Sequence, residues 1–290
     1  MIGNLILGGL AAGSLYALVG IALAIVIRVT DIPNFAQGEM AMVSTFVAYS
    51  LLDRYGLGWW AAVALALGFA VLQGVAVQIL VIRPLIGGPV LSAVIATLGL
   101  NIVLNSIAGM IWGHETHIFP SPLGDAPPVF VAGVPLPLDS VANIGVALAV
   151  ILGVTLLLRY SWAGLALRAT SQDAVMARLV GIPIGRSFAL AWGLGGLAGG
   201  IAGVLVAPAL FLDTNMMGAL LIKGFAGGVL GGLSSLWGVF GGCLVLGVLE
   251  NLVGAYLSPS FGDALTFIVL IAVLTIRPEG LLGRVRMRKV

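Results

Sequence analysis

The chain of 290 residues has a net charge of +2, a mean hydropathy of +1.18, 60% hydrophobic residues and only 8% charged residues. Soluble domains carry about 25% charged residues, so this composition excludes the one or two soluble domains that the length would allow. It predicts a single polytopic all-α membrane domain over residues 1–290. The lone cysteine, Cys243, excludes an internal disulfide and a cysteine-rich metal site.

Apolar runs follow one another along the chain, and most are long enough to cross a bilayer as a helix. They are Leu5–Ile27, Met40–Leu52, Trp59–Ile82, Val90–Trp112, Ser140–Leu158, Ser187–Leu212, Met217–Leu257 and Phe261–Ile276. The run Met217–Leu257 is longer than one span, and Gly231–Gly238 interrupts it. We therefore expect a bundle of about eight or nine transmembrane helices, two of which are broken or half-helices. Leu5–Ile27 lacks a cleavage site, so it is expected to be a retained span.

Lysine and arginine are unevenly distributed between the loops, which sets the orientation in the membrane. If the N-terminus is outside and each run crosses once, 11 of the 13 basic residues are cytoplasmic. These are Arg28, Arg83, Arg159, Arg168, Arg178, Arg186, Arg277, Arg284, Arg286, Arg288 and Lys289. Arg54 falls outside, and Lys223 falls within a span, where its side chain is expected to extend to the surface. The loop 113–139 is then external, and the loop 159–187 and the C-terminus are cytoplasmic.

The one long polar segment of the chain is Gly164–Pro183, and it carries the start and stop signals of a short helix. From the N-cap to the stop, these signals are Ser171, Asp173, Arg178, Gly181 and Pro183. They predict a helix over Gln172–Val180, with Ser171 as its N-cap. Its partly apolar surface, which includes Val175 and Leu179, indicates an element that docks against another protein.

Polar residues inside the apolar part of the chain are candidates for a translocation pathway. They are Asn34, Gln37, Glu39, Thr97, Asn101, Asn105, Ser234, Ser235 and Glu250. The first break in the apolar pattern is Asn34–Glu39 and the second is Gly231–Gly238. After Pro33, Asn34 is expected to cap the following helix together with Gln37. Thr97, Asn101 and Asn105 are four residues apart and share one helix face. Thr97, Asn101 and Asn105 could instead form hydrogen bonds to neighbouring helices. The two breaks could be ordinary surface turns. Glu250 could lie near the membrane interface and accept a hydrogen bond from a backbone amide.

Five motifs in chain order carry a resemblance to a known family. They are Ile32–Glu39, Ala96–Asn101, the G-x-A-L-R-A and A-x-x-x-G-I-P elements of Gly164–Pro183, Val229–Gly242 and Arg277–Gly283. Together they resemble the permeases of bacterial ABC importers, and most closely the H-type permease of the branched-chain amino-acid family. The resemblance implies that the polar segment is the loop that couples the permease to its ATPase. The implied coupling residues are Gly164, Arg168, Ser171, Asp173, Ala174, Val175, Ala177, Arg178 and Gly181.

The resemblance implies a multi-pass permease in the bacterial inner membrane that moves branched-chain amino acids or a related small polar solute inward. Its implied partners are a second permease subunit of the M-type, two cytoplasmic ATPase subunits and a periplasmic binding protein. No G-x-x-x-x-G-K-[ST] motif or nucleophile–base pair occurs, so we expect no enzyme activity and no cofactor here, with ATP and Mg²⁺ on the ATPase subunits. The alternatives are an ion-coupled secondary transporter or channel, a structural scaffold, and, within the ABC family, a permease for urea or short amides.

The loop after residue 112 contains both histidines of the chain. His114 and His117 lie three residues apart with Glu115 between them. Without further convergent ligands this is a weak metal pattern, and a solvated loop is the preferred interpretation.

Overall fold

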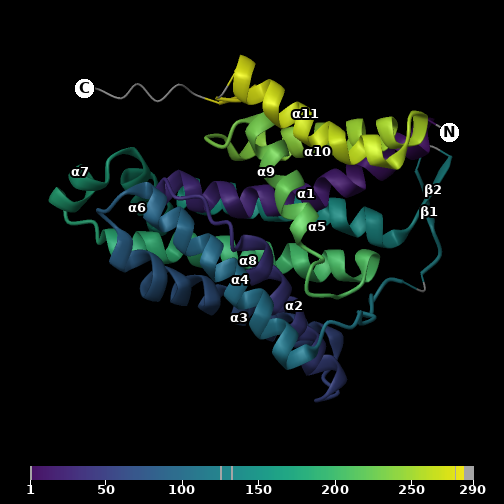
Figure 1. The fold of residues 1–290 in the computed structure, drawn as a ribbon, viewed down its shortest axis with the longest axis horizontal. Coiled ribbons are helices and arrows are strands. Elements are labelled where there is room, and N and C mark those ends of the chain that lie inside the picture. Colours follow the sequence, from purple (N-terminus) through teal and green to yellow (C-terminus); the bar gives the residue numbers. More distant parts are fainter. Residues whose placement is uncertain (1, 125, 132, 278, 284–290) are drawn as a thin grey trace. The chain divides into compact units, whose positions relative to one another are not determined.

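The computed structural model describes residues 2–283 apart from 125, 132 and 278, and this part of the chain is mostly helical (Figure 1). The helices are α1 (Ile2–Thr30), α2 (Gln37–Asp53), α3 (Trp59–Val77), α4 (Val90–Trp112), α5 (Leu138–Tyr160), α6 (Trp162–Gln172), α7 (Ala174–Leu179), α8 (Ile184–Leu210), α9 (Gly218–Gly231), α10 (Leu236–Tyr256) and α11 (Pro259–Ile276). A π-helical turn (Gln78–Ile82) and a 3₁₀ turn (Arg83–Leu85) continue α3. The strands β1 (Val129–Val131) and β2 (Val134–Leu136) form one antiparallel pair, in which Val129 lies opposite Leu136.

Six of the described helices are long and apolar enough to cross a membrane, namely α1, α3 with its continuation, α4, α5, α8 and α10. Two shorter apolar helices cover Gly218–Gly231 and Ser260–Ile276, and α2 has 17 residues. The prediction of an all-α, multi-pass membrane protein is confirmed. The expected eight or nine spans are not confirmed, because α9 has only 14 residues, and α2 and α11, with 17 and 18, are at the lower limit for a span.

The chain packs as two compact units. Unit 1 comprises Met1–Ala24, Leu123–Ile151 and Ile222–Val290, and unit 2 comprises Ile25–Pro122 and Leu152–Leu221. The organisation as a single permease domain stays a prediction. Four of the basic residues used for the orientation, Arg284, Arg286, Arg288 and Lys289, lie outside the described residues.

In unit 2, α8 packs along both α2 and α3, and glycines bring the backbones close together. A Cβ atom on Gly74 of α3 would collide with the carbonyl group of Trp192, and one on Gly203 of α8 would collide with Thr45 of α2. Small residues favour helix association in lipid because they allow this approach. Between these helices lies an apolar core that includes Met40, Ile82 and the fully buried Trp192.

In unit 1, close glycine contacts also join helices that are distant in sequence. Gly9 and Gly13 of α1 lie against the backbone of Gly247 and its neighbours in α10, and Gly227 of α9 lies against Cys243 of α10. α11 packs along α10. Unit 1 is therefore held by backbone approach as well as by side-chain packing.

Candidate functional site

The polar segment forms two helices where the sequence predicted one. α6 ends at Gln172 and α7 begins at Ala174, because Asp173 is extended, with φ −156°, and separates them. The carboxylate of Asp173 accepts hydrogen bonds from the amides of Val175 and Met176, both at 2.9 Å, so Asp173 is the N-cap of α7. The prediction that Ser171 is the N-cap was wrong. Ser171 is still inside α6, and its hydroxyl donates to the carbonyl of Arg168 at 2.8 Å.

The end of α7 follows the prediction. Gly181 has φ +86°, the left-handed conformation that glycine adopts without steric strain. Its amide donates to the carbonyl of Arg178, and the amide of Ile182 donates to the carbonyl of Ala177, both at 3.0 Å. These two bonds satisfy carbonyl groups that would lack partners at a helix end.

The surface of α7 and the residue after it is apolar and exposed. Val175 is 68% exposed, Leu179 75% and Val180 76%, and Met176 is also exposed. Ala177, on the opposite side, is buried. An exposed apolar patch on a polar-flanked helix outside the candidate spans is typical of an interaction surface.

α6 connects this patch to the long helix α5. The hydroxyl of Ser161 accepts a bond from the amide of Gly164 at 2.9 Å and caps α6. Gly164 lies against the backbone of Leu158, where a Cβ atom would collide. Arg168 extends back toward α5, with its Nη2 atom 3.5 Å from the carbonyl oxygen of Arg159. The predicted coupling residues therefore lie on or beside two capped helices, α6 and α7, of which α6 adjoins α5.

The first break, between α1 and α2, is buried and hydrogen-bonded. Asn34 is fully buried, its Oδ1 accepts from the amide of Ala36 at 3.1 Å, and its Nδ2 donates to Gln37 Oε1 at 3.0 Å. The prediction that Asn34 caps α2 was wrong, because its side chain closes a local turn two residues on and Ala36 occupies the N-cap position. Gln37 Nε2 donates to the carbonyl of Gly195 in α8 at 2.9 Å.

The polar stripe of α4 is directed at this break. The amide of Phe35 donates to Thr97 Oγ1 at 3.4 Å, and Asn101 Nδ2 donates to the carbonyl of Phe35 at 3.3 Å. One turn further, Asn105 Nδ2 donates to Glu39 Oε2 at 3.3 Å and to the carbonyl of Thr214 at 2.7 Å. The three residues thus share one face, as the spacing predicted. Their amides and hydroxyl satisfy irregular backbone that lipid could not satisfy.

The second break, between α9 and α10, is a tight turn. Gly232 has φ +97°, and Ser235 caps α10 by accepting from the amide of Gly238 at 3.1 Å. Ser234 lies in the same turn. The amides of Leu281 and Leu282 donate to the carbonyls of Leu230 and Gly231, at 2.9 Å and 3.0 Å. The end of α9 is therefore bonded to the segment that follows α11.

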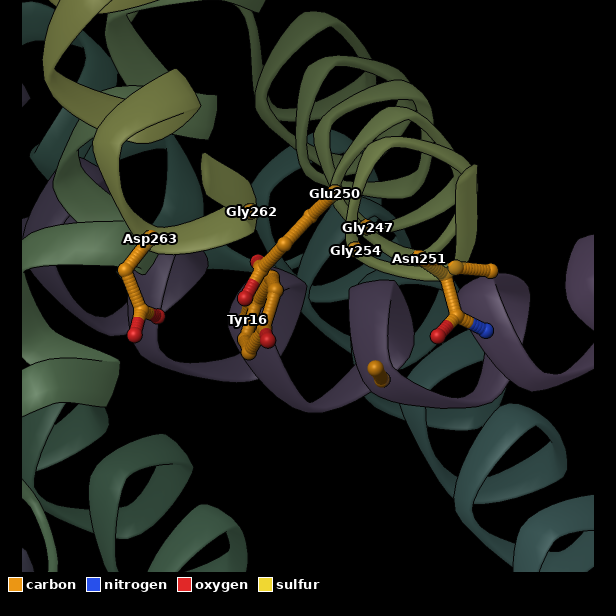
Figure 2. Close-up of a pocket in the computed structure, with 9 residues that line it drawn as sticks. Tyr16, Gly247, Glu250, Asn251, Gly254, Gly262 and Asp263 are labelled. Carbon is orange, nitrogen blue, oxygen red and sulfur yellow. The ribbon is translucent and has the colours of Figure 1, made fainter. Parts of the chain in front are cut away.

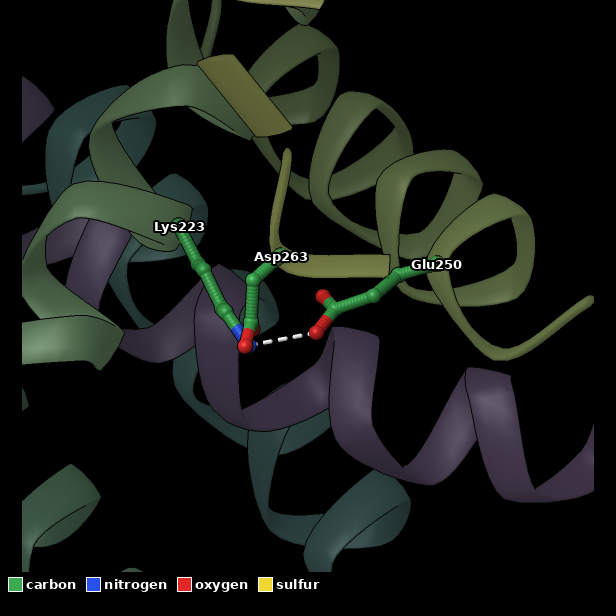
Figure 3. A network of polar contacts seen from close by, with 3 residues as sticks. All are labelled: Lys223, Glu250 and Asp263. Carbon is green, nitrogen blue, oxygen red and sulfur yellow. Dashed lines mark hydrogen bonds and ion pairs between the residues drawn. The ribbon is translucent and has the colours of Figure 1, made fainter. Parts of the chain in front are cut away.

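Glu250 forms an ion-paired cluster in unit 1 and lines a cavity (Figure 2). Lys223 of α9 donates to Glu250 Oε1, and its Nζ lies 2.9 Å from Asp263 Oδ1 of α11 (Figure 3). The side chains of Lys223 and Glu250 are only 16% and 15% exposed. The expectation that Lys223 extends to the surface was wrong, since a carboxylate in the same unit neutralises it where it lies. Glu250 binds this lysine and not a backbone amide.

Comparisons with known proteins match the chain over nearly its full length. The model of a family described as "Branched-chain amino acid transport system / permease component" matches residues 5–274. The chain belongs to this family. It is 32% identical over 296 residues to the high-affinity branched-chain amino acid transport system permease protein LivH of Escherichia coli, covering 97% of this chain and 96% of that one. It is 31% identical over 300 residues to the permease protein BraD of Pseudomonas aeruginosa, covering 98% and 97%. It is 28% identical over 291 residues to the probable permease protein LivH of Methanocaldococcus jannaschii, covering 95% and 91%.

Membership of the branched-chain amino acid permease family decides between the alternatives drawn from the sequence. The relatives are named as transport permease proteins, and the match extends over both units of this chain. The interpretation as a permease component of a transport system is therefore supported over an ion-coupled transporter or channel. The pathway and coupling roles of single residues stay predictions.

Sequence reasoning missed several polar residues of this permease. It did not connect Lys223 with Glu250 and Asp263, although a lone cation in an apolar run requires a carboxylate nearby. It also missed the π-helical turn at Gln78, whose buried amide has no hydrogen-bond partner in the described part of the chain. The two histidine rings have different hydrogen-bond partners. His114 Nδ1 lies 3.4 Å from Thr214 Oγ1, and His117 Nε2 lies 3.3 Å from the carbonyl oxygen of Trp112.

Proposed function

We propose that this chain is the transmembrane permease subunit of an ABC importer that carries branched-chain amino acids into the cytoplasm. Support comes from the family match and from relatives of almost equal length whose names give branched-chain amino acid transport. The observation that supports coupling of this transport to an ATPase is the exposed apolar surface of α7, a helix that is capped at both ends. The chain itself is proposed to hold no cofactor and to hydrolyse nothing, with ATP and Mg²⁺ bound by the ATPase subunits.

The proposed assembly contains a second permease subunit of the M-type, two cytoplasmic ATPase subunits and a periplasmic binding protein. In the bacterial inner membrane, the N-terminus would be periplasmic and the C-terminus cytoplasmic. This orientation rests on the positive-inside rule and puts the loop 159–187, with α6 and α7, on the ATPase side. The loop 113–139, with β1 and β2, would face the binding protein.

α7 is proposed to insert its apolar surface into a cleft on an ATPase subunit. Burial of Val175, Leu179 and Val180 would supply the affinity, because apolar area removed from water contributes about 25 cal/mol per Å². Closure of the ATPase dimer on ATP would then displace α7, and α6 would pass this displacement to α5. The proposed coupling set remains Gly164, Arg168, Ser171, Asp173, Ala174, Val175, Ala177, Arg178 and Gly181, of which Gly164, Arg168 and Ser171 lie in α6.

The two breaks are proposed to be the points at which the permease changes conformation. Broken helices mark the substrate path in many transporters, since their irregular backbone borders a cavity. The pathway candidates are Asn34, Gln37, Glu39, Thr97, Asn101, Asn105, Ser234, Ser235 and Glu250. Hydrogen bonds from α4 to the first break could exchange partners as the helices rock between outward and inward states.

The test of this function is the effect of α7 variants on ATPase binding. Val175→Glu would bury an unpaired carboxylate in the interface, so we expect ATPase binding about tenfold weaker or worse. Val175→Leu is the matched control, since it keeps the surface apolar and should bind as wild type does. Ala177→Pro removes the 2.9 Å hydrogen bond that the Ala177 amide donates to the Asp173 carbonyl, and should break α7 altogether.

Binding is measured by pull-down of the ATPase subunits with each variant, and function by ATP-dependent uptake of L-leucine into proteoliposomes with the binding protein. Wild-type binding and uptake by Ala177→Pro would show that α7 is a solvated loop element and would remove the ATP-driven interpretation. Uptake of urea or acetamide in place of leucine would keep the importer and change its substrate.

A further inference from the structure

Unit 1 contains a cavity of about 440 Å³ that is bordered by α1, α10 and α11 (Figure 2). Ligand pockets commonly have volumes of about 300–1,000 Å³, so this one could hold a small organic molecule. Its polar lining residues are Tyr16, Glu250, Asn251 and Asp263. The remaining lining residues are small: Ala12, Gly247, Gly254, Ala255 and Gly262. The wall around the polar groups therefore leaves room for a short aliphatic chain.

The charges at this cavity do not balance. Lys223 is bonded to Glu250 Oε1 and lies 2.9 Å from Asp263 Oδ1, so one ammonium group faces two carboxylates (Figure 3). The ring of Tyr16 lies 5.7 Å from Lys223 Nζ and presents no further positive charge. The cluster is thus one positive charge short of neutrality, and its mostly buried carboxylate is that of Glu250, whose side chain is 15% exposed.

A specific atom is left without a donor. Glu250 Oε2 is buried and has no hydrogen-bond partner in the described residues, although the hydroxyl of Tyr16 lies near the same carboxylate. A buried carboxylate oxygen normally accepts a bond, and the desolvation penalty remains in full when it does not. Asp263, the other carboxylate, is 69% exposed, so the cavity is open on that side. A ligand that enters there can reach Glu250.

We propose that this cavity binds a primary ammonium group, which donates to Glu250 Oε2 and supplies the missing positive charge. Two molecules can bring this group: a free amino acid in transit, with its aliphatic side chain against the small wall residues, and the headgroup of an aminophospholipid. The first source rests on the proposed function, whereas the second does not. Either ligand would complete the cluster in the same way, and a carboxylate without an ammonium group would not.

The experiment measures ligand binding to the assembled membrane complex, purified without the binding protein and placed in nanodiscs of phosphatidylglycerol alone. Radiolabelled L-leucine is the probe, with 3-methylbutylamine and 4-methylpentanoate as competitors that keep only one of its two charged groups. We expect the amine to displace leucine and the acid to leave it bound. A parallel arm uses nanodiscs that contain phosphatidylethanolamine and quantifies the lipid retained through detergent washes by mass spectrometry.

Two variants and a control test the site itself. Glu250→Gln removes the charge while its carbonyl can still accept from Lys223, and should weaken ammonium binding about tenfold or more. Ala12→Leu fills the cavity without changing any charge and should also weaken binding, so the test does not depend on the stability of one variant. Glu115→Gln, an exposed residue of unit 2, should bind as wild type does. The melting temperature of each complex is recorded alongside.

Glu250-dependent binding of leucine or retention of phosphatidylethanolamine supports the site and identifies the source of the ammonium group. The inference is overturned if neither molecule binds, or if binding is unchanged in both Glu250→Gln and Ala12→Leu. Wild-type uptake of leucine with no ammonium binding at this cavity would remove the inference and leave the proposed function intact. Absence of leucine uptake by the complete wild-type transporter would instead remove branched-chain amino acids as the proposed substrate, and with them the free amino acid as the source of the ammonium group.

Discussion

Asn105 makes the shortest contact of the polar stripe on α4, with Nδ2 2.7 Å from the carbonyl oxygen of Thr214 and 3.3 Å from Glu39 Oε2. Glu39 is buried, and Asn105 is the donor that faces its carboxylate. Within the described part of the chain, Asn101 Nδ2 donates one hydrogen bond, to the carbonyl of Phe35 at 3.3 Å. The two asparagines look equivalent along the sequence, but we expect their loss to have different consequences, since only Asn105 donates to a buried carboxylate.

We predict that Asn105→Leu destabilises the permease by about 1–3 kcal/mol, because it leaves the Glu39 carboxylate and the Thr214 carbonyl without a donor. Asn101→Leu should cost about 0.6 kcal/mol, the average for a side-chain hydrogen bond between membrane helices. Unfolding of the purified variants by denaturant in mixed micelles measures the difference. Leucine uptake by the same variants tests the pathway role. Equal losses of stability for both variants would contradict this ranking of the two contacts.

At the scale of the element, α7 is too short to be stable by itself. It has six residues, and isolated helices of fewer than about 12 residues are marginal in water. Its order depends on the Asp173 cap at one end, Gly181 at the other, and the burial of Ala177. A docking element of this kind can hold its apolar surface toward a partner only while both ends are capped.

We predict that Asp173→Ala loosens α7 at a cost of about 1 kcal/mol, the usual penalty for loss of an N-cap, whereas Ser171→Ala has little effect on α7. Asp173→Asn should restore the cap, because its side-chain oxygen accepts the same two amide bonds. Limited proteolysis between α6 and α8 reports the order of α7, and ATPase pull-down reports its docking. If Ser171→Ala loosens α7 more than Asp173→Ala does, the placement of the cap at Asp173 is wrong.

At the scale of the whole molecule, the orientation in the membrane is the feature on which the proposed function depends most. The basic residues that surround α6 and α7 include Arg159, Arg168, Arg178 and Arg186, and the loop after α4 has no lysine or arginine. Short loops that are rich in lysine and arginine generally remain on the cytoplasmic side of the membrane. The coupling helix and the loop 113–139 should therefore lie on opposite sides of the membrane.

This orientation predicts opposite labelling of two introduced cysteines. Glu115→Cys should react with an impermeant thiol reagent added from the periplasmic side, and Gly185→Cys only from the cytoplasmic side. Gly185 is suitable because its Cβ position has no neighbour within 4 Å, and the native Cys243 is fully buried and should stay unlabelled. Labelling of both positions from one side would overturn the orientation and, with it, the placement of the ATPase subunits.

The sequence by itself determined the class of the protein, most of the long apolar helices and the positions of the two breaks. Apolar runs, prolines and glycines act locally, so Val90–Trp112 was predicted with the bounds of α4, and the turn at Gly232 was expected. The shared face of Thr97, Asn101 and Asn105 follows from helical periodicity alone. Five short motifs in order were enough to predict the family, which the comparisons confirmed.

Only the tertiary structure decided which groups these polar residues meet. Asp173 and Ser171 are both good N-cap residues. Asp173 is the N-cap of α7 because α6 continues through Ser171 and the chain becomes extended only at residue 173. Lys223 meets Glu250, 27 residues away, because α9 and α10 pack side by side through glycines. Spacing along the chain does not encode such pairs, since they depend on which helix faces approach one another once the backbones are packed.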